Sequence, residues 1–295
     1  MQYRFRGKKY PLEALLWLLP AALVFFIFII GPLISMVNTS FYDWNGMPTT
    51  PGAFVGFSNY LTFFDDYAAQ SVIRNIGLMF LMHIFLTLPI SFLLASIVDK
   101  PLRGVRVLKT AYFLPTVMNR VAIGMMFNFL VLPRVGPLTV LVRSLGFGTL
   151  NLLGNLSTAM PTVTAVEVWA SCGFYMILFL AGMASIPQEL YEAGAMDGVN
   201  AWQRLVHITI PSLKQTFRIV IVLILTGAFK IFDFVMVLTG GGPGNATEVP
   251  ATVIYKRAFL DNRFGYADAI ATMTVAACLL ITILFNWIFR EREGR

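Results

Sequence analysis

Charged side chains are scarce in this chain. Only 13% of its 295 residues are Asp, Glu, Lys or Arg, whereas a soluble domain carries about 25%. The 57% of residues that are hydrophobic must therefore cover much of the outer surface as well as the core. So large an apolar surface needs lipid or a partner to cover it. The composition excludes an ordinary soluble domain and predicts an integral membrane protein.

Cysteine and histidine, which hold most structural metals, are also rare. Cys172 and Cys278 lie inside apolar runs and form no Cys-x-x-Cys motif, so we expect both to be small core residues. His83 and His207 have no metal-ligand spacing, and packing or hydrogen bonding is expected of each. We therefore predict no metal site and no catalytic site in this chain.

Motifs that bind nucleotides or nucleic acid are missing. The run TGGGPGNATEVP is rich in glycine, but it lacks the GK[ST] and the following helix of a phosphate-binding loop. The net charge is +7, but the basic residues are spread between the apolar runs, so nucleic acid is not expected as a partner. If ATP with Mg²⁺ drives this protein, it must bind to a separate subunit.

Long apolar runs, in contrast, are abundant. A helix of about 20 residues crosses the ~30 Å hydrocarbon core of a membrane, and six runs approach or exceed that length. They cover residues 14–37, 75–98, 110–132, 162–186, 213–238 and 267–289. The first is interpreted as a membrane span and not as a signal peptide, because its apolar core is too long and no small-x-small cleavage site follows. We predict a single all-α transmembrane domain, 1–295, with a short additional helix near 136–146.

The distribution of Lys and Arg predicts the orientation. One side of the membrane receives Arg4, Arg6, Lys8, Lys9, Lys100, Arg103, Arg106, Lys109, Arg204, Lys214, Arg218, Arg290, Arg292 and Arg295. The other side receives Arg74, Arg134, Arg143, Lys256, Arg257 and Arg263. Cytoplasmic loops carry the excess of basic residues, so the first side is cytoplasmic. Both termini and the loop between the fourth and fifth runs are then cytoplasmic.

The loop between the fourth and fifth runs is the longest clearly amphiphilic stretch of the chain. Ser185 and Gln188 have the spacing of a capping box at its start. Gly198 can supply the left-handed residue that ends a helix, and Asn200 with Gln203 offers a second cap. This pattern predicts a helix, a glycine turn and a short second helix.

Residues 187–211, here called the coupling loop, resemble the EAA loop of ABC importer permeases. That pattern runs Glu-Ala-Ala, a glycine, and then an apolar-x-apolar-Pro close. The matching residues are Glu192, Ala193, Gly194, Gly198, Ile208, Ile210 and Pro211. The runs LTGGGPGNATE, IYKRAF and FGYADAI are similar to the stretch before the last span of sugar-type permeases.

The resemblance implies a transmembrane translocation subunit of an ATP-driven, binding-protein-dependent importer of a sugar or oligosaccharide in the bacterial inner membrane. It implies four kinds of partner: a second homologous permease subunit that completes a heterodimer, two cytoplasmic ATP-binding subunits, an extracytoplasmic solute-binding protein, and membrane lipid. It also implies that the coupling loop docks on the ATPase. The residues concerned are Glu192, Ala193, Gly194, Ala195, Asp197 and Gly198.

In the maltose-type members of this family the sugar contacts lie on the fourth and fifth spans. The corresponding positions here are Glu167, Trp169, Phe174, Thr226, Phe229, Lys230 and Asp233. A structural alternative is that Arg120, Glu167, Lys230 and Asp233 neutralise one another inside the bundle, because an unpaired charge at mid-bilayer costs about 2.5–3.5 kcal/mol. Lys230 and Asp233 are three residues apart and are therefore expected on one helix face.

Two other classes of function stay open at this point. A stand-alone secondary transporter or channel would explain the spans but has no use for the coupling loop. A membrane-embedded enzyme would need a metal cluster, a Ser/Lys dyad or paired carboxylates, and the spans contain none of these. The resemblance favours the importer subunit over both.

The topology can be tested with single cysteines. Cysteines placed at Asn45 and Asn245 should react with a membrane-impermeant reagent added to intact cells, because both positions are predicted to lie outside. Cysteines at Arg103 and Gln203 should react only after the cells are permeabilised. The opposite labelling would overturn the orientation and with it the argument for a cytoplasmic ATPase.

Overall fold

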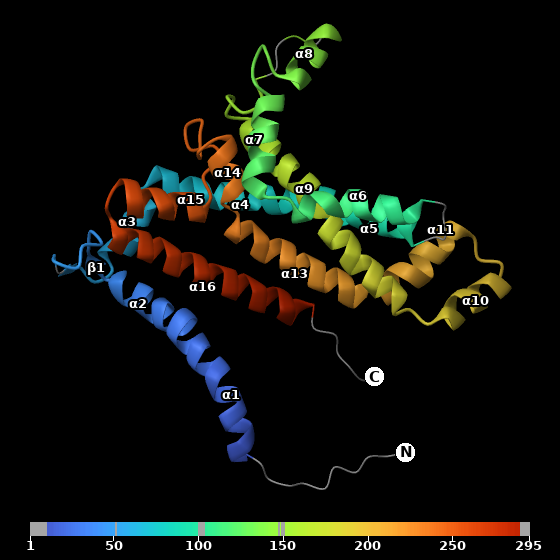
Figure 1. The fold of residues 1–295 in the computed structure, drawn as a ribbon, viewed down its shortest axis with the longest axis horizontal. Helices are drawn as coiled ribbons and strands as arrows, with labels where there is room; N and C mark the ends of the chain where they lie inside the picture. The colour runs from blue at the N-terminus through green and yellow to red at the C-terminus, as the bar shows by residue number, and fades with distance from the viewer. Residues whose placement is uncertain (1–10, 51, 100–103, 147, 149–150, 290–295) are drawn as a thin grey trace.

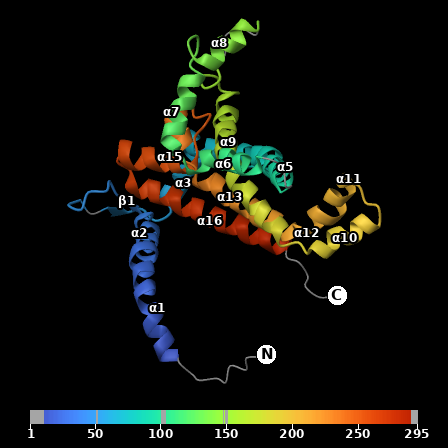
Figure 2. The same cartoon turned by 45° about the vertical axis from the view of Figure 1, so that its right-hand side comes forward.

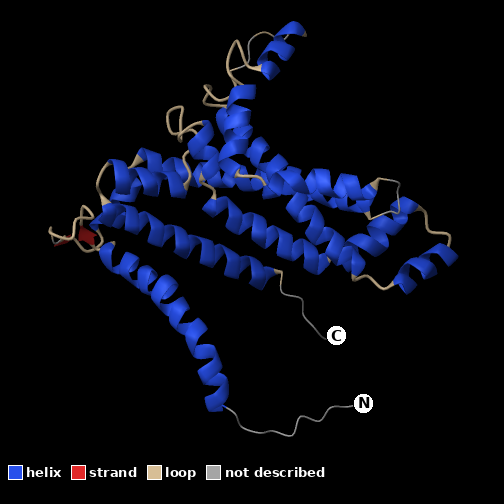
Figure 3. Cartoon of the chain, viewed as in Figure 1, coloured by secondary structure: helices blue, strands red, loops and turns tan. Residues whose placement is uncertain are grey.

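The computed structural model describes residues 11–50, 52–99, 104–146, 148 and 151–289, and this part of the chain is almost entirely helical (Figure 3). The main bundle consists of α4 (Tyr67–Met82), α5 (Leu88–Val98), α6 (Val105–Val117), α9 (Ala159–Ala184), α13 (Lys214–Lys230) and α16 (Phe264–Ile288). These helices run along the longest axis of the molecule (Figure 1). The basic residues predicted at 1–10, 100–103 and 290–295 lie outside the described residues.

The first apolar run contacts the bundle only at its C-terminal end. It forms α1 (Pro11–Phe25), the π-helical segment η1 (Phe26–Ile30) and α2 (Gly31–Thr39). The candidate span from Trp17 to Thr39 buries none of its most apolar stretch against the rest of the chain. Figures 1 and 2 show α1 diverging from the other helices. Its apolar surface must therefore be covered by lipid or by another subunit.

A small cap closes the end of the bundle at which α2 meets α16. The strands β1 (Tyr42–Asp43) and β2 (Ala53–Phe54) pair antiparallel, with Tyr42 opposite Phe54, and α3 (Ser58–Asp65) follows. The second run then continues from α4 through the π-helical η2 (His83–Thr87) into α5. This helix starts at Tyr67, eight residues before the predicted span, because the Asp66 side chain caps it by accepting from the N–H groups of Ala68 and Ala69.

Arg257 ties this capping residue to the C-terminal part of the chain. Its Nε and Nη2 donate to the two carboxylate oxygens of Asp66 at 2.9 and 2.8 Å, and the Tyr266 hydroxyl donates to the same carboxylate at 2.9 Å. Burial alone would raise the pKa of Asp66, but these hydrogen bonds outweigh burial and hold the pKa below its ordinary value of 3.8. The stability that these hydrogen bonds add is therefore fully present above pH 3.8, the ordinary pKa of the carboxyl. It is lost as the pH falls through the lower pKa that Asp66 has in the folded state.

Two of the predicted spans are broken. The third run is α6 followed by α7 (Arg120–Leu130), and the two helices meet at 97°. The fifth run ends its first helix, α13, at Lys230 and resumes as α14 (Asp233–Leu238). The short helix α8 (Pro137–Ser144) follows α7, as the sequence predicts near 136–146, and both project from the side of the bundle in Figure 1.

The chain between α9 and α13 forms the end of the bundle opposite the small cap (Figure 2). It contains α10 (Gln188–Met196), α11 (Ala201–Arg204), the π-helical η3 (Leu205–Thr209) and α12 (Ile210–Ser212). The axis turns by 69° between this segment and α13. After α14, a glycine-rich loop leads into α15 (Pro250–Tyr255) and η4 (Lys256–Leu260), which precede α16.

Helix α9 is the central element of the packing. It contributes Met160, Val163, Val166 and Ala170 to one buried cluster and Met176, Phe179 and Met183 to a second. The first cluster joins α9 to α4, α7 and α14, and the second joins it to α5 and α13. A third cluster, around Phe63, Val253 and Tyr266, packs α3, α4, α15 and α16. Both halves of the bundle therefore depend on α9.

Four helices of the described chain are long and apolar enough to cross a membrane, or up to six if each bent pair counts as one span. The predominantly helical membrane architecture agrees with the sequence. The count of six spans and the side on which each end lies stay predictions.

Gly173 tests the contact between α6 and α9. A Cβ atom at this position would lie 2.0 Å from the backbone oxygen of Tyr112 on α6. Gly173→Val should therefore separate the two helices and lower the free energy of unfolding by about 1–3 kcal/mol. Gly77→Val on α4 is the matched control, because the space around Gly77 is open. Equal thermal stability of the two purified variants would contradict this account of the packing.

Candidate functional site

The coupling loop folds as the sequence predicts at its glycine and at its second cap. Gly198 has φ +73°, the left-handed conformation that ends α10, and the Val199 N–H donates to the Gly194 carbonyl at 2.9 Å. Asn200 and Gln203 form a capping box, each side chain accepting from the backbone N–H of the other at 2.9 Å. The shape of the turn is therefore fixed by local hydrogen bonds.

The predicted cap at the start of the coupling loop is wrong. The Ser185 hydroxyl donates back to the carbonyl of Gly182 at 2.7 Å, which satisfies the end of α9 instead of the start of α10. Pro187 occupies the N-cap position of α10, with no side-chain hydrogen bond. Proline still suits this place, because it has no N–H that would need a partner.

The residues predicted to dock on an ATPase do not all share one surface. Glu192, Ala193, Ala195, Asp197 and Gly198 are exposed. Gly194, in contrast, is buried, and a Cβ atom there would lie 2.7 Å from Cδ1 of Ile208. Gly194 therefore allows the second half of the coupling loop to fold back onto α10, and it is the small residues beside it that face outward.

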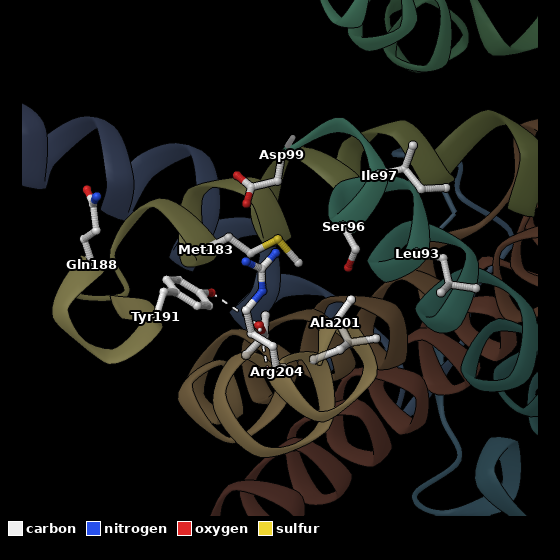
Figure 4. Close-up of a pocket in the computed structure, with 11 residues that line it drawn as sticks. Leu93, Ser96, Ile97, Asp99, Met183, Gln188, Tyr191, Ala201 and Arg204 are labelled. Carbon is white, nitrogen blue, oxygen red and sulfur yellow. Dashed lines mark hydrogen bonds between the residues drawn. The ribbon is translucent and has the colours of Figure 1, made fainter. Parts of the chain in front are cut away.

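Side chains also brace the coupling loop from within. The Tyr191 hydroxyl lies 3.3 Å from the Thr209 hydroxyl, and the Arg204 guanidinium lies 5.4 Å from the centre of the Tyr191 ring. These contacts join α10 to α11 and η3, so the coupling loop is one structural unit. A cavity of about 700 Å³ separates part of this unit from α5 (Figure 4).

The second predicted site, the substrate pathway, is centred on α9. Trp169 is 42% exposed, and its ring packs against Phe127 of α7 with 5.3 Å between centroids. Phe174 is 41% exposed and packs edge-on against Tyr175. Part of the surface of α9 is left uncovered by the rest of this chain, and this part offers large aromatic faces to a ligand.

Glu167 is not paired with the residues that the structural alternative names. Its Oε2 contacts Nε2 of His83, and Nδ1 of His83 lies 2.8 Å from the Thr87 hydroxyl. The side chains of His83 and Glu167 are 5% and 13% exposed. The hydrogen bonding expected of His83 is thus found, but its link to Glu167 between η2 and α9 was not predicted. Two residues 84 positions apart give no local sequence signal of a contact.

The expectation that Lys230 and Asp233 share a helix face is wrong. Lys230 is the last residue of α13 and Asp233 the first of α14, and the extended backbone at Ile231 separates the two helices. Ion pairs in the described residues join His83 to Glu167, Lys256 to Glu248, and Arg257 to both Asp66 and Asp261. None includes Arg120, Lys230 or Asp233, so mutual neutralisation of the four charges is not found there.

The remaining pathway residues lie on or near α13. The Thr226 hydroxyl is used within its own helix, where it donates to the Val222 and Leu223 carbonyls at 3.0 and 3.1 Å. Phe229 is half-buried, whereas Lys230 is exposed at the end of α13. Lys230 is therefore better placed than Thr226 to meet a polar ligand.

The two helix breaks are neighbours in space. Asn119 caps α7 by accepting from the Val121 and Ala122 N–H groups at 2.9 and 3.2 Å. Asn128 on α7 donates to the Val237 and Leu238 carbonyls of α14 at 3.4 and 3.3 Å. Arg120, which the sequence places in the middle of a span, is instead the first residue of α7. Its guanidinium lies 5.8 Å from the Phe234 ring centre on α14.

Comparison with known proteins gives matches over almost the whole chain. Residues 67–292 match the family described as "Binding-protein-dependent transport system inner membrane component". The chain is 35% identical over 279 residues to the "Probable ABC transporter permease protein YurN" of Bacillus subtilis (strain 168), covering 93% of this chain and 95% of that protein. It is 30% identical over 285 residues to the "Trehalose/maltose transport system permease protein MalF" of Thermococcus litoralis, covering 94% of each.

The fold also matches a solved structure. A chain of the "bacterial alginate ABC transporter in complex with alginate pentasaccharide-bound periplasmic protein" superposes with a TM-score of 0.83, covering 94% of both chains. The sequence identity is 22%, so this likeness establishes the fold.

The buried contact of His83 with Glu167 can be measured directly. His83→Leu should lower the free energy of unfolding by about 3–5 kcal/mol, because the carboxylate of Glu167 loses its partner where water cannot replace it. The double variant His83→Leu with Glu167→Leu should recover most of that loss. His207→Leu is the control, since His207 is exposed on the coupling loop. The free energy of unfolding of each purified variant is obtained from its thermal unfolding. If the separate effects of His83→Leu and Glu167→Leu simply add in the double variant, the two side chains do not interact, and the contact is refuted.

Proposed function

The chain belongs to the family of binding-protein-dependent transport system inner membrane components, and from this premise we propose that it is one of two subunits lining the passage of an ATP-driven sugar importer. Membership of the family confirms that the chain is a membrane transport subunit and not an enzyme. The energy source is a separate ATP-binding subunit. ATP with Mg²⁺ would bind there, and this chain would need no cofactor of its own.

The proposal that the substrate is a sugar or oligosaccharide rests on two supports. One relative is a permease protein of a trehalose/maltose system, and the superposed structure is an alginate transporter. In this chain, the aromatic faces of Trp169 and Phe174 are partly exposed on α9. A flat aromatic ring packs well on the apolar face of a sugar ring, while the exposed charge of Lys230 can replace water at its hydroxyls.

The proposed membrane arrangement is six spans at about residues 14–37, 75–98, 110–132, 162–186, 213–238 and 267–289, of which the third and the fifth are broken. The termini and the coupling loop would face the cytoplasm, because the predicted cytoplasmic side holds most of the basic residues. The small cap of β1, β2 and α3 lies at the opposite end of the bundle from α10 and α11 (Figure 1). That end would face the extracytoplasmic solute-binding protein.

The coupling loop is the proposed site of contact with the ATPase. Its outward surface carries little side chain at Ala193, Ala195 and Gly198, so another protein's backbone can approach closely. Glu192 and Asp197 on the same segment add negative charge. Hydrogen bonds and packing hold the segment from α10 through α12 together as one unit. A displacement of α10 by the ATPase would therefore move α13 and α9 as well, instead of deforming only the coupling loop.

The second homologous subunit of the proposed heterodimer would cover apolar faces that this chain leaves open. Almost all of α1 and α2 from Trp17 onward is exposed, and so are Leu279, Leu280 and Ile283 on α16. Lipid can cover some of this surface. A passage through the membrane, however, needs walls on all sides, and the exposed aromatic residues of α9 lie on an open surface of this single chain.

A stand-alone transporter or channel is the alternative function, because family membership already excludes an enzyme. The observation that favours the importer is the self-braced coupling loop, since a protein that works alone needs no such unit at the end of its bundle.

Coupling to the ATPase can be tested at Gly198. Gly198→Val should strain the left-handed turn by about 1–3 kcal/mol and displace the docking surface. The assembled complex should persist, but its substrate-stimulated ATP hydrolysis should fall. Gly104→Val is a matched control, because Gly104 also has a positive φ, +84°, but caps α6 outside the coupling loop. Normal hydrolysis by both Gly198→Val and Glu192→Lys would show that the coupling loop has no docking role.

The passage can be tested at Trp169. Trp169→Ala should reduce uptake per assembled complex by about tenfold at low substrate concentration, which is the upper end of what one aromatic contact provides. Trp287→Ala on the exposed face of α16 should leave uptake unchanged. The double change Lys230→Met with Asp233→Leu should also reduce uptake while the complex assembles. Wild-type uptake by Trp169→Ala would remove the stacking surface from the proposal.

A further inference from the structure

A cavity beside the coupling loop has no part in the proposed passage. It has a volume of about 700 Å³ and is bounded by the last turns of α5, the end of α9, α10, α11 and η3 (Figure 4). It touches none of the pathway residues on α9 or α13. Part of its wall lies on α5, whose final residues end the second membrane span at Val98. The cavity therefore lies at the level where a lipid headgroup meets water.

Among the described residues, one cation and one anion line this cavity. Arg204 enters it from α11, and Figure 4 shows its guanidinium pointing upward between Met183 and Tyr191. Asp99 borders it from the C-terminal end of α5. Neither residue belongs to an ion pair within the described part of the chain. A negative charge at a helix C-terminus is unfavourable by about 0.3–1 kcal/mol, so a cation beside Asp99 would be stabilised.

The rest of the lining has both apolar and hydroxyl character. Leu93 and Ile97 lie one turn apart on α5 and are 52% and 50% exposed, so they form an apolar strip that leads along the membrane span into the cavity. Ser96, Tyr191 and Thr209 add hydroxyl groups to the wall. An occupant should therefore carry two opposite charges at one end and a hydrocarbon chain at the other.

We propose that this cavity holds the headgroup of a zwitterionic membrane lipid that has a primary ammonium group, of the phosphatidylethanolamine class. The phosphate binds the Arg204 guanidinium, whose planar fork suits two phosphate oxygens. The ammonium binds the Asp99 carboxylate, and an acyl chain lies along Leu93 and Ile97. The proposed topology determines which leaflet of the membrane supplies this lipid. The contacts that bind its headgroup do not depend on that topology.

The same two charges discriminate against other lipids. Phosphatidylglycerol offers the phosphate but no cation for Asp99, so its headgroup brings a negative charge toward a carboxylate and gives it no partner. Phosphatidylcholine is a zwitterion like phosphatidylethanolamine, but its quaternary ammonium has no N–H to donate to a carboxylate. The expected order of binding is therefore phosphatidylethanolamine, then phosphatidylcholine, then phosphatidylglycerol.

The test uses the assembled importer in vesicles that contain equal parts of the three lipids. The complex is extracted in mild detergent, and the lipids retained per complex are counted by mass spectrometry. Phosphatidylethanolamine should be enriched about tenfold over phosphatidylglycerol, the gain expected of one charge-assisted hydrogen bond. Asp99→Asn should abolish the enrichment, whereas Arg204→Gln should lower the retention of all three lipids, because all three bind Arg204 through the phosphate. Arg204→Lys keeps the charge and should restore part of that retention, and Arg106→Gln, an exposed arginine outside the cavity, should change neither the retention nor the enrichment.

Three outcomes would overturn the proposal. They are equal retention of the three lipids, preference for phosphatidylglycerol, and enrichment that survives Asp99→Asn. Displacement of the lipid by soluble glycerophosphoethanolamine at low concentration would assign the cavity to a cytosolic ligand instead. Retention is counted without transport, so failure here leaves the importer proposal standing, and a failed importer proposal leaves the lipid count valid.

Discussion

The structure depends on satisfying backbone hydrogen bonds where a membrane offers no water. Lipid-exposed breaks in a helix are not tolerated at that depth, so a broken span must be covered by protein or face a cavity. The two broken spans pack against each other through α7 and α14, which buries Ile231 at the second break, whereas residues 117–120 at the first break are left for another subunit to cover. Asn119 caps the start of α7, and Asn128 donates to the Val237 and Leu238 carbonyls at the end of α14. Irregular backbone is thereby gathered beside the aromatic surface of α9, where a passage needs polar groups.

Hydropathy alone was enough to predict the helical membrane fold and the approximate position of every long apolar run. It did not reveal the breaks, because both runs are apolar on average, although Asn119 with Arg120 marks the first break and Lys230 with Asp233 marks the second. Lys230 and Asp233 were misplaced for that reason, since a three-residue spacing puts two side chains on one face only if the helix continues. The contact of His83 with Glu167 was missed because it depends on how η2 and α9 pack, which the local sequence does not encode.

Local motifs predicted the coupling loop better than any other part. The turn at Gly198 and the reciprocal cap of Asn200 with Gln203 follow from rules that act within four residues. The role of Gly194 could not be seen in this way. Its missing side chain looked like part of an outward surface, but the space is used inside the loop by Ile208, 14 positions later. Close packing between distant residues, and not the motif itself, decides which of the small residues face a partner.

These features together describe a passage subunit whose energy comes from outside the chain. Reconstitution of the complete importer into proteoliposomes tests this claim most directly. With ATP on the coupling-loop side, and the binding protein with labelled oligosaccharide on the other, uptake should require ATP, the binding protein and this chain together. Uptake by this chain alone, without ATP-binding subunits or binding protein, would contradict the account and identify a stand-alone transporter or channel.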